Sequence, residues 1–97
     1  MIVKLSKPIT VGGELLTEIT LRDPTVDDVA NIGYPFLLDI SDGGTSIRLQ
    51  PKVILKYASA LAGVPPSSLK AISLGDLSSL QEAVMNFFGD AAGTSQN

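Results

Sequence analysis

The 97-residue sequence contains no cysteine and no histidine, and these two absences exclude several kinds of chemistry. Without cysteine the chain has no disulfide and no thiol nucleophile, and without either residue it lacks the usual zinc ligands. Without histidine it also lacks the side chain that most often acts as a base near neutral pH. Because no imidazole can activate its serines, we expect neither an enzyme nor a cofactor.

Long apolar runs and clusters of basic residues are also missing. No stretch approaches the ~18 consecutive apolar residues of a membrane span, and the N-terminus does not open an export signal. We therefore expect a cytoplasmic protein with no membrane partner. Seven Lys and Arg residues stand against ten Asp and Glu residues, for a net charge of −3, and the basic residues are scattered. Nucleic-acid binding is disfavoured for this reason.

Apolar residues, in contrast, are abundant. They make up 44% of the sequence, and the mean hydropathy is +0.30. A chain of this length forms one domain, and its high ratio of surface to volume should place many polar residues outside. The apolar excess therefore predicts that part of the surface meets a partner. A second copy of the chain is one expected partner, so we expect a homo-oligomer.

The N-terminal segment has the two-residue alternation of β-strands. A first strand is predicted over Ile2–Val11 and a second over Leu15–Arg22, joined by a turn at Gly12-Gly13. Pro8 indicates an edge position or a bulge in the first strand. The positions predicted to face the core are Val3, Leu5, Ile9, Val11, Leu15, Thr17, Ile19 and Leu21.

About three helices are predicted after this hairpin. The first covers Val26 to about Asn31 and is capped by Thr25. The second runs from Pro51 to Gly63, and the third runs from a cap at Asp76 to a stop at Gly89. The buried stripe of the third helix is expected to contain Leu77, Leu80, Val84 and Phe87.

The segment between the first two helices gives conflicting signals. Pro35 prevents a helix from continuing through Tyr34, while the segments 36–40 and 45–49 flank a turn at Asp42-Gly43-Gly44. This pattern is that of a second hairpin over residues 36–49. The fold class is then α+β, with one domain over residues 1–89 and a disordered tail over residues 90–97.

Residues Leu5 to Val29 carry a longer pattern, L-x-x-P-I-x-x-x-G-x-x-x-x-E-I-T-L-R-D-P-T-x-x-D-V. This pattern resembles the opening of the tail assembly chaperones of contractile-tailed, Mu-like bacteriophages. The segment from Gly33 to Leu49 departs from that family's pattern. The residues that resemble the family's closing helix are Leu69, Leu74, Asp76, Leu80, Val84, Phe87, Phe88 and Gly89.

The resemblance implies a protein that binds the tape-measure protein while the phage tail is built and is absent from the mature virion. It implies binding without catalysis, in the cytoplasm of the infected bacterium, with the tail tube protein as a second expected partner. It also implies that a ribosomal frameshift yields a longer form of the chain. The alternative is a small structural subunit of the tail or baseplate, which would be found in purified particles.

Two acidic patterns raise the hypothesis of a metal site, and neither is favoured. Asp23, Asp27 and Asp28 lie close in sequence, but acidic residues at the start of a helix are explained by its free N–H groups and its dipole. Residues 39–50 have the length of a calcium loop, but they lack an Asp or Asn in the fifth position and the final Glu. We therefore expect no metal.

A partner-binding surface is predicted on the C-terminal helix. Adjacent helical residues point about 100° apart, so Phe88 should lie at the margin of the stripe that contains Phe87, or face outward. Aromatic residues and Met are enriched at interfaces. The predicted surface contains Tyr57, Leu61, Met85 and Phe88. Two alternatives remain open: Phe88 shares the core with Phe87, or the surface lies on the segment from Tyr34 to Leu49.

Overall fold

Strands and helices follow one another along the chain in the computed structural model, which describes residues 1–41 and 43–93. Two antiparallel hairpins and four helices are present in this part of the chain, which confirms the predicted α+β class. The elements are β1 (Ile2–Val11), β2 (Glu14–Thr20), α1 (Val26–Ile32), β3 (Phe36–Ser41), β4 (Gly44–Leu49), α2 (Pro51–Ala62), α3 (Pro66–Leu69) and α4 (Leu74–Gly93).

Strand β1 contains a bulge of three extra residues between Lys4 and Ile9. Lys4 pairs with Glu18 and Ile9 pairs with Leu16, so β1 advances five residues while β2 advances two. The bulge that Pro8 indicated is therefore present. It also changes which residues of β2 face the core, because the inward positions Leu16 and Ile19 are now three residues apart. The prediction that Leu15 and Thr17 face the core is wrong, since Leu15 is 70% exposed and Thr17 is also exposed.

Asp76 connects this bulge to the last helix. The backbone N–H of Ser6 donates to Asp76 Oδ1 at 2.8 Å, and the N–H of Lys7 donates to Asp76 Oδ2 at 3.2 Å. The Asp76 residue is buried. Its own N–H donates to Ser73 Oγ at 3.1 Å, so the Ser73 hydroxyl caps a helix that begins at Leu74. The prediction that Asp76 caps the helix is wrong, because its carboxylate binds the strand instead.

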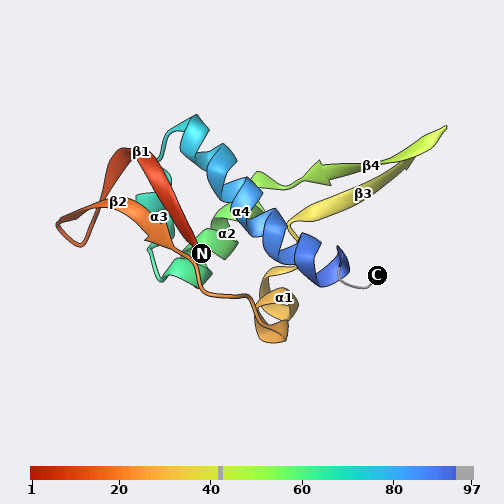
Figure 1. The fold of residues 1–97 in the computed structure, drawn as a ribbon, viewed down its shortest axis with the longest axis horizontal. Helices are drawn as coiled ribbons and strands as arrows, with labels where there is room; N and C mark the ends of the chain where they lie inside the picture. Colours follow the sequence, from red (N-terminus) through yellow and green to blue (C-terminus); the bar gives the residue numbers. More distant parts are fainter. Residues whose placement is uncertain (42, 94–97) are drawn as a thin grey trace.

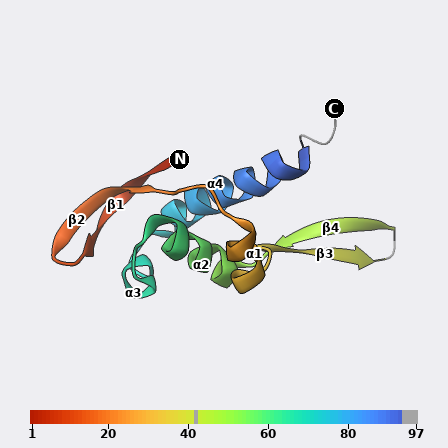
Figure 2. The ribbon, with the colours of Figure 1, turned by 90° about the horizontal axis from the view of Figure 1, so that it is seen from below.

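The core lies where the N-terminal hairpin meets helices α2 and α4 (Figures 1 and 2). The N–H of Arg22 donates to the Leu61 carbonyl at 3.1 Å, which joins the end of the hairpin to the end of α2. Helices α2 and α4, which begin near the predicted starts at Pro51 and Asp76, cover this hairpin. The buried side chains of the two helices include Ile54, Tyr57, Ala58, Leu61, Leu80, Ala83 and Val84.

Helix α1 begins at a reciprocal capping pair, as its sequence predicted. The Thr25 N–H donates to Asp28 Oδ2 at 2.8 Å, and the Asp28 N–H donates to Thr25 Oγ1 at 3.3 Å. Arg22 forms a two-point ion pair with the same carboxylate, with Nη1 2.8 Å from Oδ2. The guanidinium, followed by the Thr25 N–H, lowers the pKa of Asp28 from its usual range. These contacts fix the direction in which α1 leaves the hairpin.

Strands β3 and β4 form the predicted second hairpin, with Phe36 opposite Leu49 and Ser41 opposite Gly44. Asp42, in the predicted turn, lies outside the described residues. At the base of this hairpin the N–H of Gln50 donates to the Pro35 carbonyl at 2.9 Å. Both ribbon views show the hairpin projecting from the body and reaching past the end of α4 (Figures 1 and 2). Its outer part is therefore not covered by the helices.

Helix α4 is longer than predicted. It continues through Gly89 to Gly93, so Gly89 does not act as the stop. The backbone φ of Gly89 is not positive. Gly63, in contrast, ends α2 in the left-handed conformation, at φ 69°. Residues 94–97 lie outside the described part of the chain, and for them the disordered tail stays a prediction.

We expect the stability of the protein to fall in acid through Asp76. The N–H of Ser6, with a smaller contribution from the N–H of Lys7, lowers the pKa of this carboxyl despite its burial. A lowered folded-state pKa stabilises the fold above the ordinary pKa of an aspartate, and the gain is lost as pH falls through the folded-state pKa. Asp76→Asn should lower the unfolding midpoint at neutral pH and weaken this acid dependence.

The measurement is urea unfolding followed by circular dichroism at a series of pH values. Glu82→Gln is the matched control, because Glu82 is an exposed carboxylate on the same helix. An Asp76→Asn variant that unfolds at the same urea concentration as the unmodified protein, at neutral pH and in acid, would contradict the role given to this carboxylate.

Candidate functional site: an apolar groove between α1 and α4

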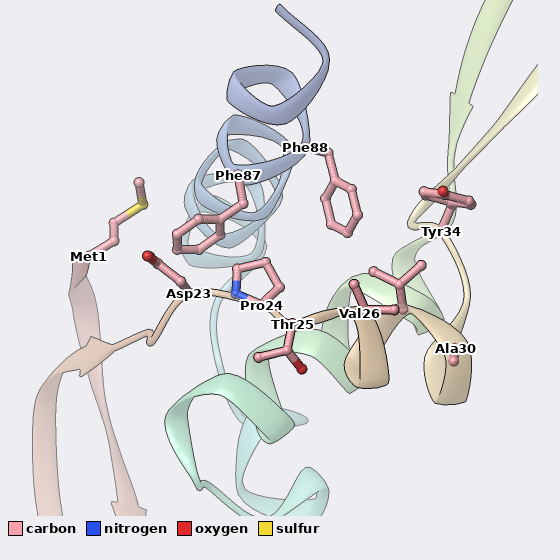
Figure 3. A pocket seen from close by; sticks show the side chains of 10 residues that line it. Met1, Asp23, Pro24, Thr25, Val26, Ala30, Tyr34, Phe87 and Phe88 are labelled. Atoms are coloured by element: carbon pink, nitrogen blue, oxygen red, sulfur yellow. The ribbon is translucent and has the colours of Figure 1, made fainter. Parts of the chain in front are cut away.

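A groove with a volume of about 820 Å³ opens between helix α1 and the C-terminal half of α4. The segment that joins β2 to α1 runs along its floor, with Met1 at one end and Tyr34 at the other (Figure 3). Most of the lining side chains are apolar. The lining residues are Met1, Asp23, Pro24, Thr25, Val26, Val29, Ala30, Tyr34, Phe87 and Phe88.

Phe87 and Phe88 form the α4 side of the groove. Both side chains are half-buried, and both point from α4 toward Pro24 and Val26 in the close view (Figure 3). Their neighbour Val84 is completely buried and holds this face of α4 against the core. Because successive helical residues point about 100° apart, the two rings share the margin of the buried stripe and leave part of each ring at the surface.

Phe88 is also the centre of an aromatic cluster that consists of Tyr34, Phe36, Tyr57 and Phe88. Its ring centroid lies 5.4 Å from that of Tyr57, 5.9 Å from that of Tyr34 and 6.3 Å from that of Phe36. All three contacts have the edge-to-face geometry that aromatic pairs prefer. The cluster thus joins α4, α2, the base of β3 and the segment that follows α1.

Tyr57 supports the cluster from within the core. Its side chain is completely buried, and its hydroxyl donates to the Gly33 carbonyl at the end of α1. Burial, with smaller effects from Asp28 and Tyr34, raises the pKa of the Tyr57 hydroxyl, so the group stays protonated and able to donate. This hydrogen bond keeps Tyr34 at the end of the groove.

Two carboxylates lie at or near the groove. Asp23 is the charged side chain of the lining, while Asp28 nearby is held by Arg22. Within residues 1–41 and 43–93, no group of three or more acidic side chains is arranged to hold a metal ion. The groove offers apolar area and aromatic rings, which suit the binding of an apolar segment of another protein.

The structure does not bring the four predicted binding residues together on one surface. Phe88 lines the groove, and Tyr57 lies against it from below. Tyr57 is 0% exposed and Leu61 is 4% exposed, so neither side chain reaches the surface of this chain. Met85 is half-buried on α4 and does not line the groove. Direct contact with a partner stays a prediction for Phe88 and Met85, and Tyr57 contributes as a support.

Several groove residues were not predicted from the sequence. Val26 is 85% exposed at the first position of α1, and Tyr34 is 57% exposed just after that helix. Val26 was considered only as the first residue of a helix, whereas Tyr34 belonged to the alternative surface over the segment from Tyr34 to Leu49. The available signal was the short length of α1, because seven residues with few buried positions leave apolar side chains outside.

The chain is thus a small α+β domain with an apolar groove on its surface. A model of the family described as phage tail assembly chaperone proteins, E, or 41 or 14, matches residues 2–89. The match covers most of the chain, which therefore belongs to this family. A search of curated proteins and a search of solved structures each gave no match.

The family match confirms that the sequence resembles phage tail assembly chaperones. The narrower resemblance, to contractile-tailed and Mu-like phages, stays a prediction. Among the helices that the structure describes, none is both long enough and apolar enough to cross a membrane.

We expect Phe88→Ala to destabilise the fold less than Leu80→Ala. Leu80 is completely buried between α4 and the hairpin, so its truncation should lower the free energy of unfolding by ~2–5 kcal/mol. Phe88 is half-buried, so the loss should lie below the ~3–5 kcal/mol of a fully buried Phe. Urea unfolding of both variants at equal concentration measures the difference. Equal losses of unfolding free energy would show that Phe88 is a core residue and not a binding residue.

Proposed function

We propose that this chaperone binds the tape-measure protein during assembly of the phage tail, through the groove between α1 and α4. The observation that carries the proposal is the groove itself, in which exposed apolar residues of α1 face two half-buried phenylalanines of α4. A long, apolar and helical client needs such a surface before it enters the tail. The family assignment supports the assembly role, and the groove supports the kind of contact.

The proposed contact is that of an amphipathic helix laid in an apolar groove. Val26 is exposed on the α1 wall and Tyr34 at one end of the groove, so the apolar face of a client helix can bury them together with Phe87 and Phe88. The aromatic cluster keeps the floor and one end of the groove in place, which reduces the cost of ordering these side chains on binding. The mechanism is binding alone, without catalysis.

The proposal includes the setting of this binding. The chain acts in the cytoplasm of the infected bacterium and leaves the tail before the virion is complete. The tail tube protein is a second partner in the same process. A longer form produced by a frameshift would carry its additional segment beyond α4, the helix that forms one wall of the groove.

We expect Val26→Glu to weaken capture of the tape-measure protein. A carboxylate at this position would have to be buried against an apolar client, so we expect capture to fall by roughly tenfold or more, which corresponds to ~1.4 kcal/mol. Val26 is the first residue of α1, where a negative charge is favourable to the helix, so the fold should be unaffected.

Leu74→Glu is the matched control for this change. Leu74 is 83% exposed at the first residue of α4, compared with 85% for Val26 at the first residue of α1, and it does not line the groove. The measurement is co-purification of the tape-measure protein with each tagged variant after co-expression. Equal capture of the tape-measure protein by both variants would show that the client binds outside the groove.

We also expect the protein to be absent from purified virions. Mass spectrometry of particles should detect the tube and tape-measure proteins and not this chain, while infected-cell lysate contains it. A stoichiometric amount in particles would instead support the alternative function, a small structural subunit of the tail or baseplate.

A further inference from the structure

The hairpin of β3 and β4, which we call the arm, carries an apolar face that nothing in the described chain covers. The strand pairing places Phe36 opposite Leu49, Leu38 opposite Ile47 and Ile40 opposite Thr45, so these residues share one face of the ribbon. The exposed fractions are 62% for Leu38, 77% for Ile40, 60% for Ile47 and 36% for Leu49. The base of the arm, at Phe36, is joined to the body through the aromatic cluster.

The exposed positions of the β1–β2 hairpin and the arm face differ in composition. The β1–β2 hairpin carries Lys4, Lys7 and Glu18 at exposed positions and a bulge with Pro8, which are features that prevent pairing with another chain. The arm face has no charged residue at any of its six positions, no proline and no break in register. Arg48 lies opposite Leu37 and therefore belongs to the other face. The arm face has the composition of a surface that is buried when the protein binds a partner.

We propose that the arm face is a dimerisation surface, and that its occupant is the same face of a second copy of this chain. A two-stranded ribbon alone is marginally stable in water and needs cover over its apolar face. The arm needs this cover in the free chaperone, before any client is bound. A second copy of the chain is the partner that is present at that stage. Two such faces pack without burying a charge, which satisfies the self-complementarity of a two-fold contact.

The size of the arm sets the strength of this contact. Stable complexes bury roughly 800 Å² per partner. Two strands of six residues, with four large apolar side chains exposed on one face, cannot supply that area alone. The dimer is therefore reversible, and its population rises with protein concentration. The protection of the arm from solvent rises with it, while the β1–β2 hairpin stays equally protected in monomer and dimer.

The experiment compares an arm variant, Ile40→Glu with Ile47→Glu, with the control Leu15→Glu. Leu15 is an aliphatic residue of the other hairpin with a similar exposed fraction, 70%. Sedimentation of the full chain between about 1 and 100 µM measures the dimer, and circular dichroism checks that each variant folds. Hydrogen exchange at both concentrations measures the protection of β3 and β4 against that of β1 and β2.

We expect the unmodified protein and Leu15→Glu to dimerise as concentration rises, with slower exchange in the arm, and the arm variant to stay monomeric with a folded body. An unmodified protein that stays monomeric at 100 µM overturns the proposal, as does an arm variant that still forms the dimer. A monomeric protein whose arm variant loses capture of the tape-measure protein would assign the arm to the client. Because no client is present in the dimer measurement, its failure leaves the groove proposal standing.

Discussion

The carboxylate of Asp76 is the contact on which the arrangement of the domain depends. It accepts hydrogen bonds from the N–H groups of Ser6 and Lys7, in the part of β1 that the bulge separates from β2. Ser6 and Lys7 are exposed residues, but their hydrogen bonds to Asp76 are part-buried, so the carboxylate stabilises the bulge. The same residue lies in the first turn of α4. One side chain therefore sets the register of the hairpin and the position of the helix over it.

The position of α4 in turn creates the groove. With its first turn fixed on β1, the helix places Leu80 and Val84 in the core and brings Phe87 and Phe88 opposite α1. At the other wall, Arg22, Thr25 and Asp28 fix the start of α1. The two walls are thus anchored by separate polar contacts, and the aromatic cluster joins them near Tyr34. A groove of this kind is largely formed before a client binds, which favours affinity.

Local patterns were sufficient for much of the fold. The alternation in Ile2–Val11, the capping pair at Thr25, and Pro51 and Gly63 at the ends of α2 each act within a few residues, so these elements could be predicted. The errors arose where distant contacts decide. Leu15 faces outward because the bulge changes the alternation along β2. Asp76 does not cap the helix because its side chain binds a strand 70 residues earlier in the sequence. Local propensity contains no information about either contact.

The candidate site shows the same division. The sequence by itself determined a chain without histidine or cysteine, an apolar excess that indicates a partner, and the pattern of the chaperone family. It also predicted Phe88 at the margin of the buried stripe or facing outward, because helical geometry is local, and it left a shared core position open. Only the tertiary structure decided that Val26 and Tyr34 face Phe88 across a groove, that Tyr57 lies buried beneath, and that the arm projects with its apolar face uncovered. The reason is that a groove and an uncovered face arise from how separate elements are placed against one another, and long-range contacts fix that placement.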